Sequence, residues 1–474
     1  MSTSSTPLRG LSPLEMYYAA RDHLNIYHSA ACLARYTPTS ASSTSPSDIS
    51  RHFYASLASV VHSQPMLRVG MANTSNANTA YFTYLPSINL ESHVRVITIS
   101  AATEAAFAAE SARIQAQAHG DKWQDLETTA PWRLIIIRSD STAINFEDII
   151  FVFHHSLLDG MSAKLFHKHL LTALNTTAAT DDSMPHKLSF TTPPDLPPGQ
   201  EETVPVTTSL PFLLRTLWSE LGPSYLKPKP TPIWAAKDVT LSIPNVTHLI
   251  PIDISAADTK QLLSACKSHK ATLTALLHAL ILSLLSRRFP SSKFTCATPM
   301  SLRPYSSDPK SETLRNLLTT HHTDLSASTD IWSSAAHIRS DFAARLASLP
   351  ANDVTMLTKY VSNWNDFLRK KDGSPRNGSW EISNVGVLSP GAAAADAGDA
   401  KYKITRVLFS NAGMPTGAAI GVNVVSVADG PLGISLSWQK DIVDDELVKY
   451  VASGLRKLVD GFCARGEFSL DDVE

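Results

Sequence analysis

Residues 151–160 read FVFHHSLLDG and place two adjacent histidines, His154 and His155, directly after an apolar run. A neutral imidazole, whose ordinary pKa is about 6.5, can accept a proton from a hydroxyl group as that group attacks an electrophile. For this chemistry the ring must project from a rigid element into a cavity. Consecutive strand residues face opposite sides, so both rings cannot enter one cavity unless the strand has already ended. The stretch therefore predicts a general base at a strand end.

An aspartate and a glycine complete the pattern HHxxxDG, because Asp159 and Gly160 follow His155 after three spacer residues. An aspartate at this spacing either orients the imidazole or braces the loop by pairing with an arginine. Glycine at position 160 lets the chain turn tightly into the next helix, where a side chain would crowd the turn. The whole pattern is far more specific than a lone histidine.

The segments around the histidines predict a strand–turn–helix junction. The runs Trp132–Arg138 and Ile149–Phe153 are short, β-branched and bounded by polar residues, which favours strands. The second run has no polar alternation, as expected of a strand that is covered on both faces. After Gly160 an apolar stripe recurs at helical spacing, and it consists of Met161, Leu165, Phe166, Leu170 and Ala173.

The rest of the chain repeats this mixture of helices and strands. The stretch QPMLRVGM predicts an extended segment. The leucines between residues 273 and 285 predict an amphipathic helix, and the alternation from Leu432 to Trp438 predicts a strand with one buried face. Further helices are expected at Pro13–Leu24, about Pro46–Ser63, from Ser255 onward and at Leu447–Phe462, with a further strand in 294–304.

A stretch rich in Pro, Thr and Ser, Thr176–Pro211, predicts a connector rather than a core element. A second Pro-rich piece follows at 223–232, and Phe212–Leu221 between them predicts a short surface helix. We therefore expect an N-terminal domain at 1–175 that carries the histidines, a crossover at 176–240 and a C-terminal domain at 241–474. The predicted fold class is a two-part mixed α/β enzyme.

Composition excludes several classes of function. The chain has 474 residues, 43% hydrophobic and 18% charged, and a formal charge of −2, which suits a globular protein with no nucleic-acid partner. The apolar stretch 271–286 is shorter than the ~20 residues that span a bilayer, so it predicts a core helix. The N-terminus lacks the apolar region of a secretory signal. We expect a cytoplasmic protein, acting as a monomer, without a membrane span.

The other reactive side chains of the sequence do not predict a second catalytic or metal site. The four cysteines, Cys32, Cys266, Cys296 and Cys463, are far apart, which favours buried free thiols over disulfides or zinc. The pair at 321–322 lacks the Asp-Gly and predicts a polar strand edge. His167 and His169 lie two apart on a helix and face different ways, so no metal site is expected. The G-x-S-x-G of a serine hydrolase is absent.

The pattern HHxxxDG resembles the signature of the CoA-dependent acyltransferase superfamily, which includes chloramphenicol acetyltransferase, the plant BAHD enzymes and peptide-synthetase condensation domains. The DFGWG motif of the BAHD branch is absent. The chain is most similar to the fungal alcohol acetyltransferase family, in which secondary metabolism is a plausible setting. The further stretches that carry this resemblance are LRGLSPLEMYYAARDHLNIY, PWRLIIIR, ATLTALLHALIL, PMSLRP and EISNVGVL.

The resemblance implies two chloramphenicol-acetyltransferase-like mixed-sheet domains with an active-site channel between them. It implies that the second histidine of the motif, His155, is the base, whereas His154 shapes the strand end. Asp159 is then a structural carboxylate paired with an arginine, for which Arg303 is the first choice and Arg68 the second. Ser383 and Asn384 are expected to approach the channel and to touch the acceptor or CoA.

The resemblance also implies the reaction. Acetyl-CoA or another acyl-CoA serves as co-substrate, no cofactor is bound tightly, and the acceptor is a small-molecule alcohol. Three alternatives stay open at this point. They are a condensation-type enzyme that takes its acyl group from a carrier protein, a cyclase or isomerase that reuses the fold and the histidine, and a non-catalytic binding protein.

Overall fold

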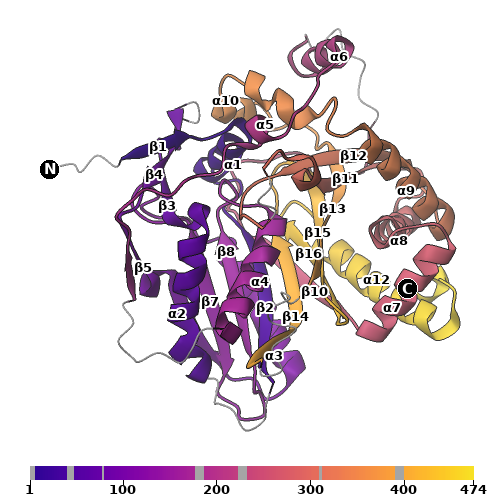
Figure 1. Cartoon of the computed structure of the whole chain (residues 1–474). Coiled ribbons are helices and arrows are strands. Elements are labelled where there is room, and N and C mark those ends of the chain that lie inside the picture. The colour runs from indigo at the N-terminus through magenta and orange to yellow at the C-terminus, as the bar shows by residue number, and fades with distance from the viewer. Residues whose placement is uncertain are drawn as a thin grey trace.

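The protein is a mixed α/β molecule built around two main sheets (Figure 1), as the sequence predicts. The computed structural model describes residues 6–39, 47–76, 79–176, 186–222, 232–308, 312–389 and 400–473.

The first sheet has five strands in the order β14-β2-β8-β7-β6. The predicted strand before the histidines is β8, and it lies at the centre of this sheet. Ile149, Phe151 and Phe153 of β8 pack with α2 and α4 on one face, while Ile150 and Val152 pack with α3 on the other. The elements are β14 (Tyr402–Asn411), β2 (Ala30–Pro38), β8 (Glu147–Phe153), β7 (Trp132–Ser139), β6 (Val94–Ile99), α2 (Ser47–Ser63), α3 (Glu104–Ala118) and α4 (Gly160–Thr176).

The second sheet has six strands in the order β10-β16-β15-β13-β11-β12. Helices α7, α8, α9 and α12 cover one of its faces and form a separate hydrophobic core with it (Figure 1). Its elements are β10 (Thr247–Ile254), β16 (Leu432–Gln439), β15 (Ala418–Val427), β13 (Gly378–Leu388), β11 (Lys293–Ser301), β12 (Leu318–Ser326), α7 (Ala256–Ser268), α8 (Leu273–Arg288), α9 (Ile331–Ser348) and α12 (Asp445–Arg465).

Strand β14 connects the two sheets. It comes late in the chain, yet it pairs antiparallel with β2 of the first sheet, where Asn411 lies opposite Ala30. The chain then returns to the second sheet as β15, which pairs with β13 and β16. The division into 1–175, 176–240 and 241–474 stays a prediction, and β14 shows that one strand of the third segment contributes to the sheet of the first.

Two predicted elements are more deeply buried than their sequence patterns indicate. Helix α8 is not amphipathic, because every residue from Ala275 to Ser286 is buried between α7, α9, α12 and the sheet. Strand β16 is buried on both faces rather than one. The reason is that β14 covers the face away from the helices, so closely that a Cβ on Gly433 would lie 2.1 Å from the Val407 carbonyl oxygen.

The segment QPMLRVGM is not wholly extended as predicted. Residues Pro65–Arg68 form a short 3-10 helix before β3 (Val69–Ala72), since proline suits the first position of a helical turn. Strand β3 belongs to a small sheet in the order β1-β4-β3, and β5 pairs with β9. These strands are β1 (Pro7–Gly10), β4 (Tyr81–Tyr84), β5 (Ser87–Asn89) and β9 (Lys187–Ser189).

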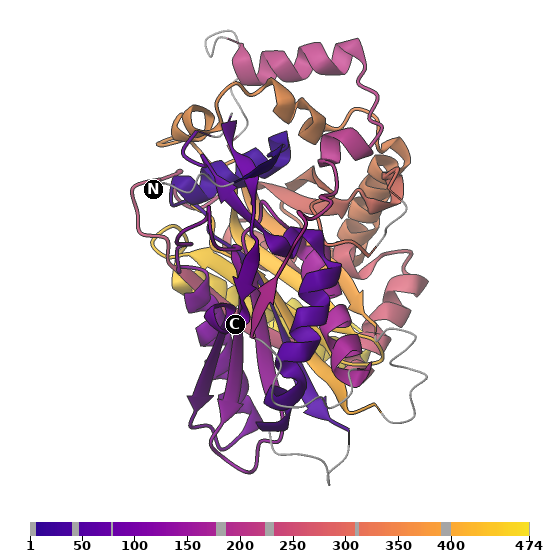
Figure 2. The same ribbon diagram turned by 60° about the vertical axis from the view of Figure 1, so that its left-hand side comes forward.

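Helices α1, α5, α6 and α10 surround one end of the two sheets (Figures 1 and 2). The predicted surface helix is α6, which lies at the periphery in both views with Leu210, Leu214 and Trp218 exposed. The Pro-rich residues 223–231 and the start of the connector at 177–185 lie outside the described residues, as does Pro46. These helices are α1 (Pro13–His23), α5 (Gln200–Thr203), α6 (Leu210–Leu221) and α10 (Trp364–Arg369).

Within the described ranges, no single helix has both the length and the apolar composition needed to cross a membrane. In the same ranges, one bent pair, α7 and α8 with 93° between them, satisfies that test by length and composition.

Candidate active site

The two histidines follow the last residue of β8, and α4 begins at Gly160, so the predicted strand–turn–helix junction is present. The side chains still alternate past the strand end. His155 lies on the same side as Phe153 and stacks on Tyr18, whereas His154 lies near Trp123. The two imidazoles therefore have separate environments, and the second one lines a cavity.

His154 is held by protein groups away from the cavity. Its Nδ1 accepts a hydrogen bond from the Ser156 main chain at 3.0 Å, and its Nε2 lies 3.6 Å from a carboxylate oxygen of Asp22. The other oxygen of Asp22 lies 2.5 Å from Nδ1 of His28. Contacts with both histidines outweigh burial and lower the pKa of Asp22 to about 2. His154 is not among the residues that line the cavity, and its role in shaping the strand end stays a prediction.

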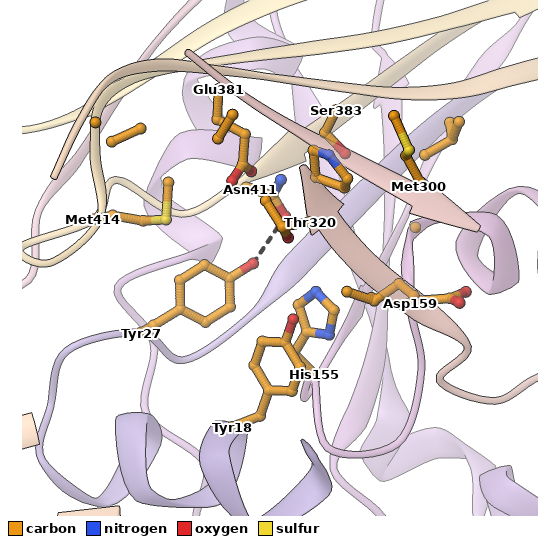
Figure 3. A pocket seen from close by; sticks show the side chains of 18 of the residues that line it. Tyr18, Tyr27, His155, Asp159, Met300, Thr320, Glu381, Ser383, Asn411 and Met414 are labelled. Atoms are coloured by element: carbon orange, nitrogen blue, oxygen red, sulfur yellow. Dashed lines mark hydrogen bonds between the residues drawn. The ribbon is translucent and has the colours of Figure 1, made fainter. Parts of the chain in front are cut away.

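His155 is fixed on its ring face and on its main chain. The ring stacks on Tyr18 with centroids 3.8 Å apart and planes within 2° of parallel (Figure 3). The main-chain carbonyl accepts a hydrogen bond of 2.6 Å from Asn316. Nδ1 is buried, so Nε2 is the nitrogen that remains to face the cavity. Burial lowers the pKa of His155 to about 4, opposed by its own carbonyl and by Asp159, so the ring is neutral at pH 7.

The carboxylate of Asp159 points away from His155 (Figure 3) and pairs with Arg303. Two hydrogen bonds of 2.6 and 3.1 Å join the guanidinium to the carboxylate, and main-chain N–H groups of Leu317 and Ser162 donate two more at 3.0 and 2.8 Å. Burial opposes ionisation, but the Arg303 charge and these four bonds outweigh it and hold the pKa of Asp159 below its usual range.

The predicted pairing with Arg303 is therefore present. The second choice, Arg68, lies elsewhere, over the ring of Phe190 at 3.9 Å, and donates to the Thr192 carbonyl. Of the two roles considered for Asp159, the geometry favours the bracing one, because its carboxylate makes no hydrogen bond to His155.

Gly160 is required by packing rather than by the turn itself. A Cβ at this position would lie 2.6 Å from Cγ1 of Val385 on β13 and 2.9 Å from Cζ of Phe409 on β14. Those distances are too short for any side chain, so the start of α4 lies directly against strands that come much later in the chain. The prediction of crowding is correct, but the crowding groups are distant in sequence.

The cavity that His155 lines has a volume of about 280 Å³. Its walls come from α1, from the turn after β8, and from β11, β12, β13, β14 and the loop after β14, so residues of both sheets meet there. The predicted residues Ser383 and Asn384 of β13 both line it. Asn384 already donates to Thr274 Oγ1 at 3.0 Å, and a substrate contact for either residue stays a prediction.

Several cavity residues were not predicted as site residues. Tyr18, Arg21 and Tyr27 come from the quoted N-terminal stretch, and Glu381 comes from EISNVGVL. His322 lies on the edge strand β12, as predicted for the second histidine pair, yet it also lines the cavity, and burial lowers its pKa. The one sequence signal for Tyr18, Arg21, Tyr27 and Glu381 was their presence in stretches that carry the family resemblance. Tertiary contacts bring them to the cavity that His155 lines.

The described residues offer neither a cluster of metal ligands nor an activated cysteine. No group of three metal-ligating side chains occurs in them. Cys32, Cys266 and Cys296 are buried free thiols as predicted, whereas Cys463 is only half-buried. Burial raises the pKa of Cys32 and Cys296 to about 12 and that of Cys266 to about 11, which leaves no reactive thiolate at pH 7.

The arrangement of two sheets is also found in solved structures of an acetyltransferase and of a condensation domain. The trichothecene 15-O-acetyltransferase TRI3 from Fusarium sporotrichioides covers 96% of this chain and 94% of its own, with a TM-score of 0.68 at 11% identity. The first condensation domain of the CDA synthetase covers 100% and 99%, with a TM-score of 0.61 at 13% identity. These likenesses define the fold as the two-domain condensation and acetyltransferase type, which confirms the predicted fold class.

Sequence comparisons identify the family. The probable alcohol acetyltransferase FCK4 of Fusarium pseudograminearum is 26% identical over 487 residues, which cover 98% of this chain and 97% of the relative. The probable alcohol acetyltransferase crmB of Aspergillus fumigatus is 26% identical over 473 residues, which cover 94% and 97%. The family model for alcohol acetyltransferase matches residues 123–460. The chain belongs to the alcohol acetyltransferase family and is an acyltransferase, which confirms the predicted enzyme class.

Proposed function

We propose that the protein transfers an acyl group, in the first instance acetyl, from acyl-CoA to a hydroxyl group of a small-molecule alcohol, with His155 as the general base. The family supplies the reaction class and the use of acyl-CoA as co-substrate. The observation that carries the assignment of the base is the position of His155, whose neutral ring stacks on Tyr18 at the wall of the cavity.

The transfer is direct in this proposal. Nε2 of His155 accepts the proton of the acceptor hydroxyl while the hydroxyl oxygen forms a bond to the thioester carbonyl carbon. The tetrahedral oxyanion collapses, the carbon–sulfur bond breaks, and the proton passes from His155 to the leaving CoA thiolate. The ester and free CoA leave, and the imidazole is again neutral. No acyl-enzyme forms.

The surrounding residues keep the base in position. Tyr18 fixes the plane of the ring, and Asn316 holds the main chain of His155 and Ser156 at 2.6 and 3.1 Å. Asp159 and Arg303 fix the turn that follows. A base held in one orientation is effective because the reacting hydroxyl then needs to be placed only relative to a rigid group.

The identity of the acyl donor is tested by supplying either acetyl-CoA or an acylated carrier protein. The protein is incubated with acetyl-CoA and a panel of alcohols, and free thiol and ester are measured together. Thiol release that depends on the alcohol, with one ester formed per thiol, is the expected result. Ester formation only from an acylated carrier protein would instead support the condensation-type alternative. A product formed without any acyl donor would support a cyclase or isomerase.

A further inference from the structure

A second carboxyl group, Glu381, lies across the cavity from His155 (Figure 3). It sits within β13, where its neighbours Trp380 and Ile382 are buried in the core beneath the helices. Because successive strand residues point to opposite faces, Glu381 points into the cavity. Glutamate is rarely placed in the interior of a protein unless another group pairs with it.

No hydrogen bond or ion pair to the Glu381 carboxyl occurs within the described part of the chain. A charge that acts on it is that of Arg21, whose guanidinium lines the same cavity. Burial raises the pKa of Glu381 and the Arg21 charge opposes that effect. The two groups therefore face one space without a hydrogen bond or ion pair between them.

Arg21 also lacks a carboxylate partner among the described residues. Its side chain is 5% exposed, and Nε is buried without a hydrogen bond. The guanidinium carbon instead lies over the rings of Tyr27, Tyr17 and Tyr18, at 4.3, 5.3 and 5.9 Å from their centroids. Ring faces stabilise a buried cation in part, but they leave its N–H donors unsatisfied.

Polar side chains beside Arg21 and Glu381 form hydrogen bonds with one another. Tyr27 donates to Oδ1 of Asn411 at 2.8 Å, as Figure 3 shows, and Asn411 donates to Oδ1 of Asn423 at 2.9 Å. Asn423 in turn donates to Ser435 and Ser437 of β16. Hydrogen bonds between protein groups thus stabilise this part of the wall, whereas Arg21 and Glu381 face the cavity without an ion-pair partner among the described residues. Arg21 is buried and Glu381 is half-buried, and a polar group that faces a cavity without a protein partner is available to a ligand.

We propose that Glu381 binds the acceptor, and that the acceptor is an alcohol with a second hydroxyl group. One hydroxyl reacts at His155 while the other donates a hydrogen bond to Glu381, so diols and polyols are the preferred class. A neutral hydroxyl suits the site better than an ammonium group, since Arg21 already supplies a positive charge, and a hydroxyl lone pair can accept from a guanidinium. This inference rests on the proposed transfer reaction.

The acceptor fits this position better than the charged end of the donor. CoA carries phosphate groups, and a carboxylate repels them at short range. The uncharged pantetheine amides are the remaining part of the donor that could meet Glu381, so the experiment must separate an effect on the acceptor from an effect on the donor.

The test compares matched alcohols of three to eight carbons. Each α,ω-diol is set against its monomethyl ether, which keeps the second oxygen but loses its O–H, against the n-alkanol in which a methyl group of similar size replaces the second hydroxyl, and against the ω-dimethylamino alcohol, which is cationic. Values of kcat/KM per reacting hydroxyl are measured for the wild type, Glu381→Leu, Glu381→Gln and the control Glu446→Leu, whose carboxylate is exposed on α12.

The wild type is expected to prefer the diol over the ether about tenfold or more at one chain length, the effect of a hydrogen bond to a charged group. Glu381→Leu should remove this preference while still acetylating the ether, Glu381→Gln should keep part of it, and Glu446→Leu should keep all of it.

A preference that Glu381→Leu leaves intact would overturn the inference, as would a wild type that treats diol and ether alike at every length. A preference for the dimethylamino alcohol that depends on Glu381 would replace the diol class with a cationic one. A raised KM for acetyl-CoA with every acceptor would assign Glu381 to the donor. Absence of thiol release with all alcohols would contradict the transfer reaction itself.

Discussion

Two carboxylates face the same region of the molecule and have opposite surroundings. Asp159, after β8, accepts four hydrogen bonds, two of them from Arg303. Glu381, on β13, accepts none from the residues that the structure describes, and the Arg21 charge that acts on it forms no ion pair with it. A carboxylate whose hydrogen bonds are all made to protein groups serves the fold. A carboxylate that lines a cavity without such bonds is available to a ligand.

The difference follows from what each carboxylate must do in the folded chain. Asp159 joins α4 to the segment before β12, because Arg303 also donates to the Ser162 hydroxyl and to the Arg315 carbonyl at 2.9 and 3.0 Å. These contacts link the end of β8 to residues about 150 positions later in the chain. Glu381 makes no such link, so its removal should change substrate binding and leave the fold intact.

Breaking the Asp159 pair should have the largest effect on stability. Asp159→Ala leaves the Arg303 guanidinium buried without its counterion, and we expect the free energy of unfolding to fall by about 3–5 kcal/mol. Urea denaturation measures this change. The control Asp366→Ala removes an exposed pair with Arg369 and should cost less than about 1 kcal/mol. Equal losses in the two variants would refute the structural role of Asp159.

Removing the Asn316 amide should have an intermediate effect. The side chain is buried, and in Asn316→Ala the carbonyls of His155 and Ser156 lose their hydrogen bonds from it. We expect the free energy of unfolding to fall by about 1–3 kcal/mol and kcat to fall with it, because the base is less well held. Denaturation and steady-state rates measure the two effects. Unchanged stability together with unchanged kcat would show that the contact does not position His155.

Replacing Glu381, unlike replacing Asp159, should barely affect the stability of the fold. Glu381→Gln loses no hydrogen-bond or ion-pair partner among the described residues and nearly keeps the shape of the side chain, so the free energy of unfolding should change by less than about 0.5 kcal/mol. The same urea experiment measures it. A loss of several kcal/mol would mean that Glu381 is paired in solution, and the contrast with Asp159 would disappear.

The smallest expected effect is that of mild acid on the rate. The pKa of His155 is lowered to about 4, so the ring binds a proton only as the pH falls through that value, and kcat/KM should stay level from pH 8 to about pH 5. The profile is measured in the wild type and in Glu381→Gln, because burial raises the pKa of that second carboxyl. An inflection near 6.5 in both proteins would indicate an exposed base instead of the buried one.

The sequence was sufficient for the local part of the site. A buried strand, a turn and a helix are contiguous in the chain, so β8, His155, Asp159 and the start of α4 could be predicted from neighbouring residues and from the motif. The partner Arg303 came only from the resemblance to the family, since nothing local relates it to Asp159.

The distant parts of the site could not be predicted in the same way. The position of Glu381 depends on the register of β13 in the second sheet, and Tyr18 reaches His155 because α1 packs beside the end of β8. The burial of β16 on both faces, where one was expected, has the same origin in β14. The pattern within one strand does not show which distant element packs against it, and each of these features depends on such an element.

The measurement that tests the central claim most directly is the rate of CoA thiol release from acetyl-CoA and an alcohol in His155→Ala. Removing a general base is expected to lower this rate by about 10²–10⁴-fold while the protein stays folded. The control His169→Ala, which removes an exposed-face imidazole that bonds to the Glu312 carbonyl, should keep the wild-type rate. Transfer that persists undiminished in His155→Ala would contradict the account.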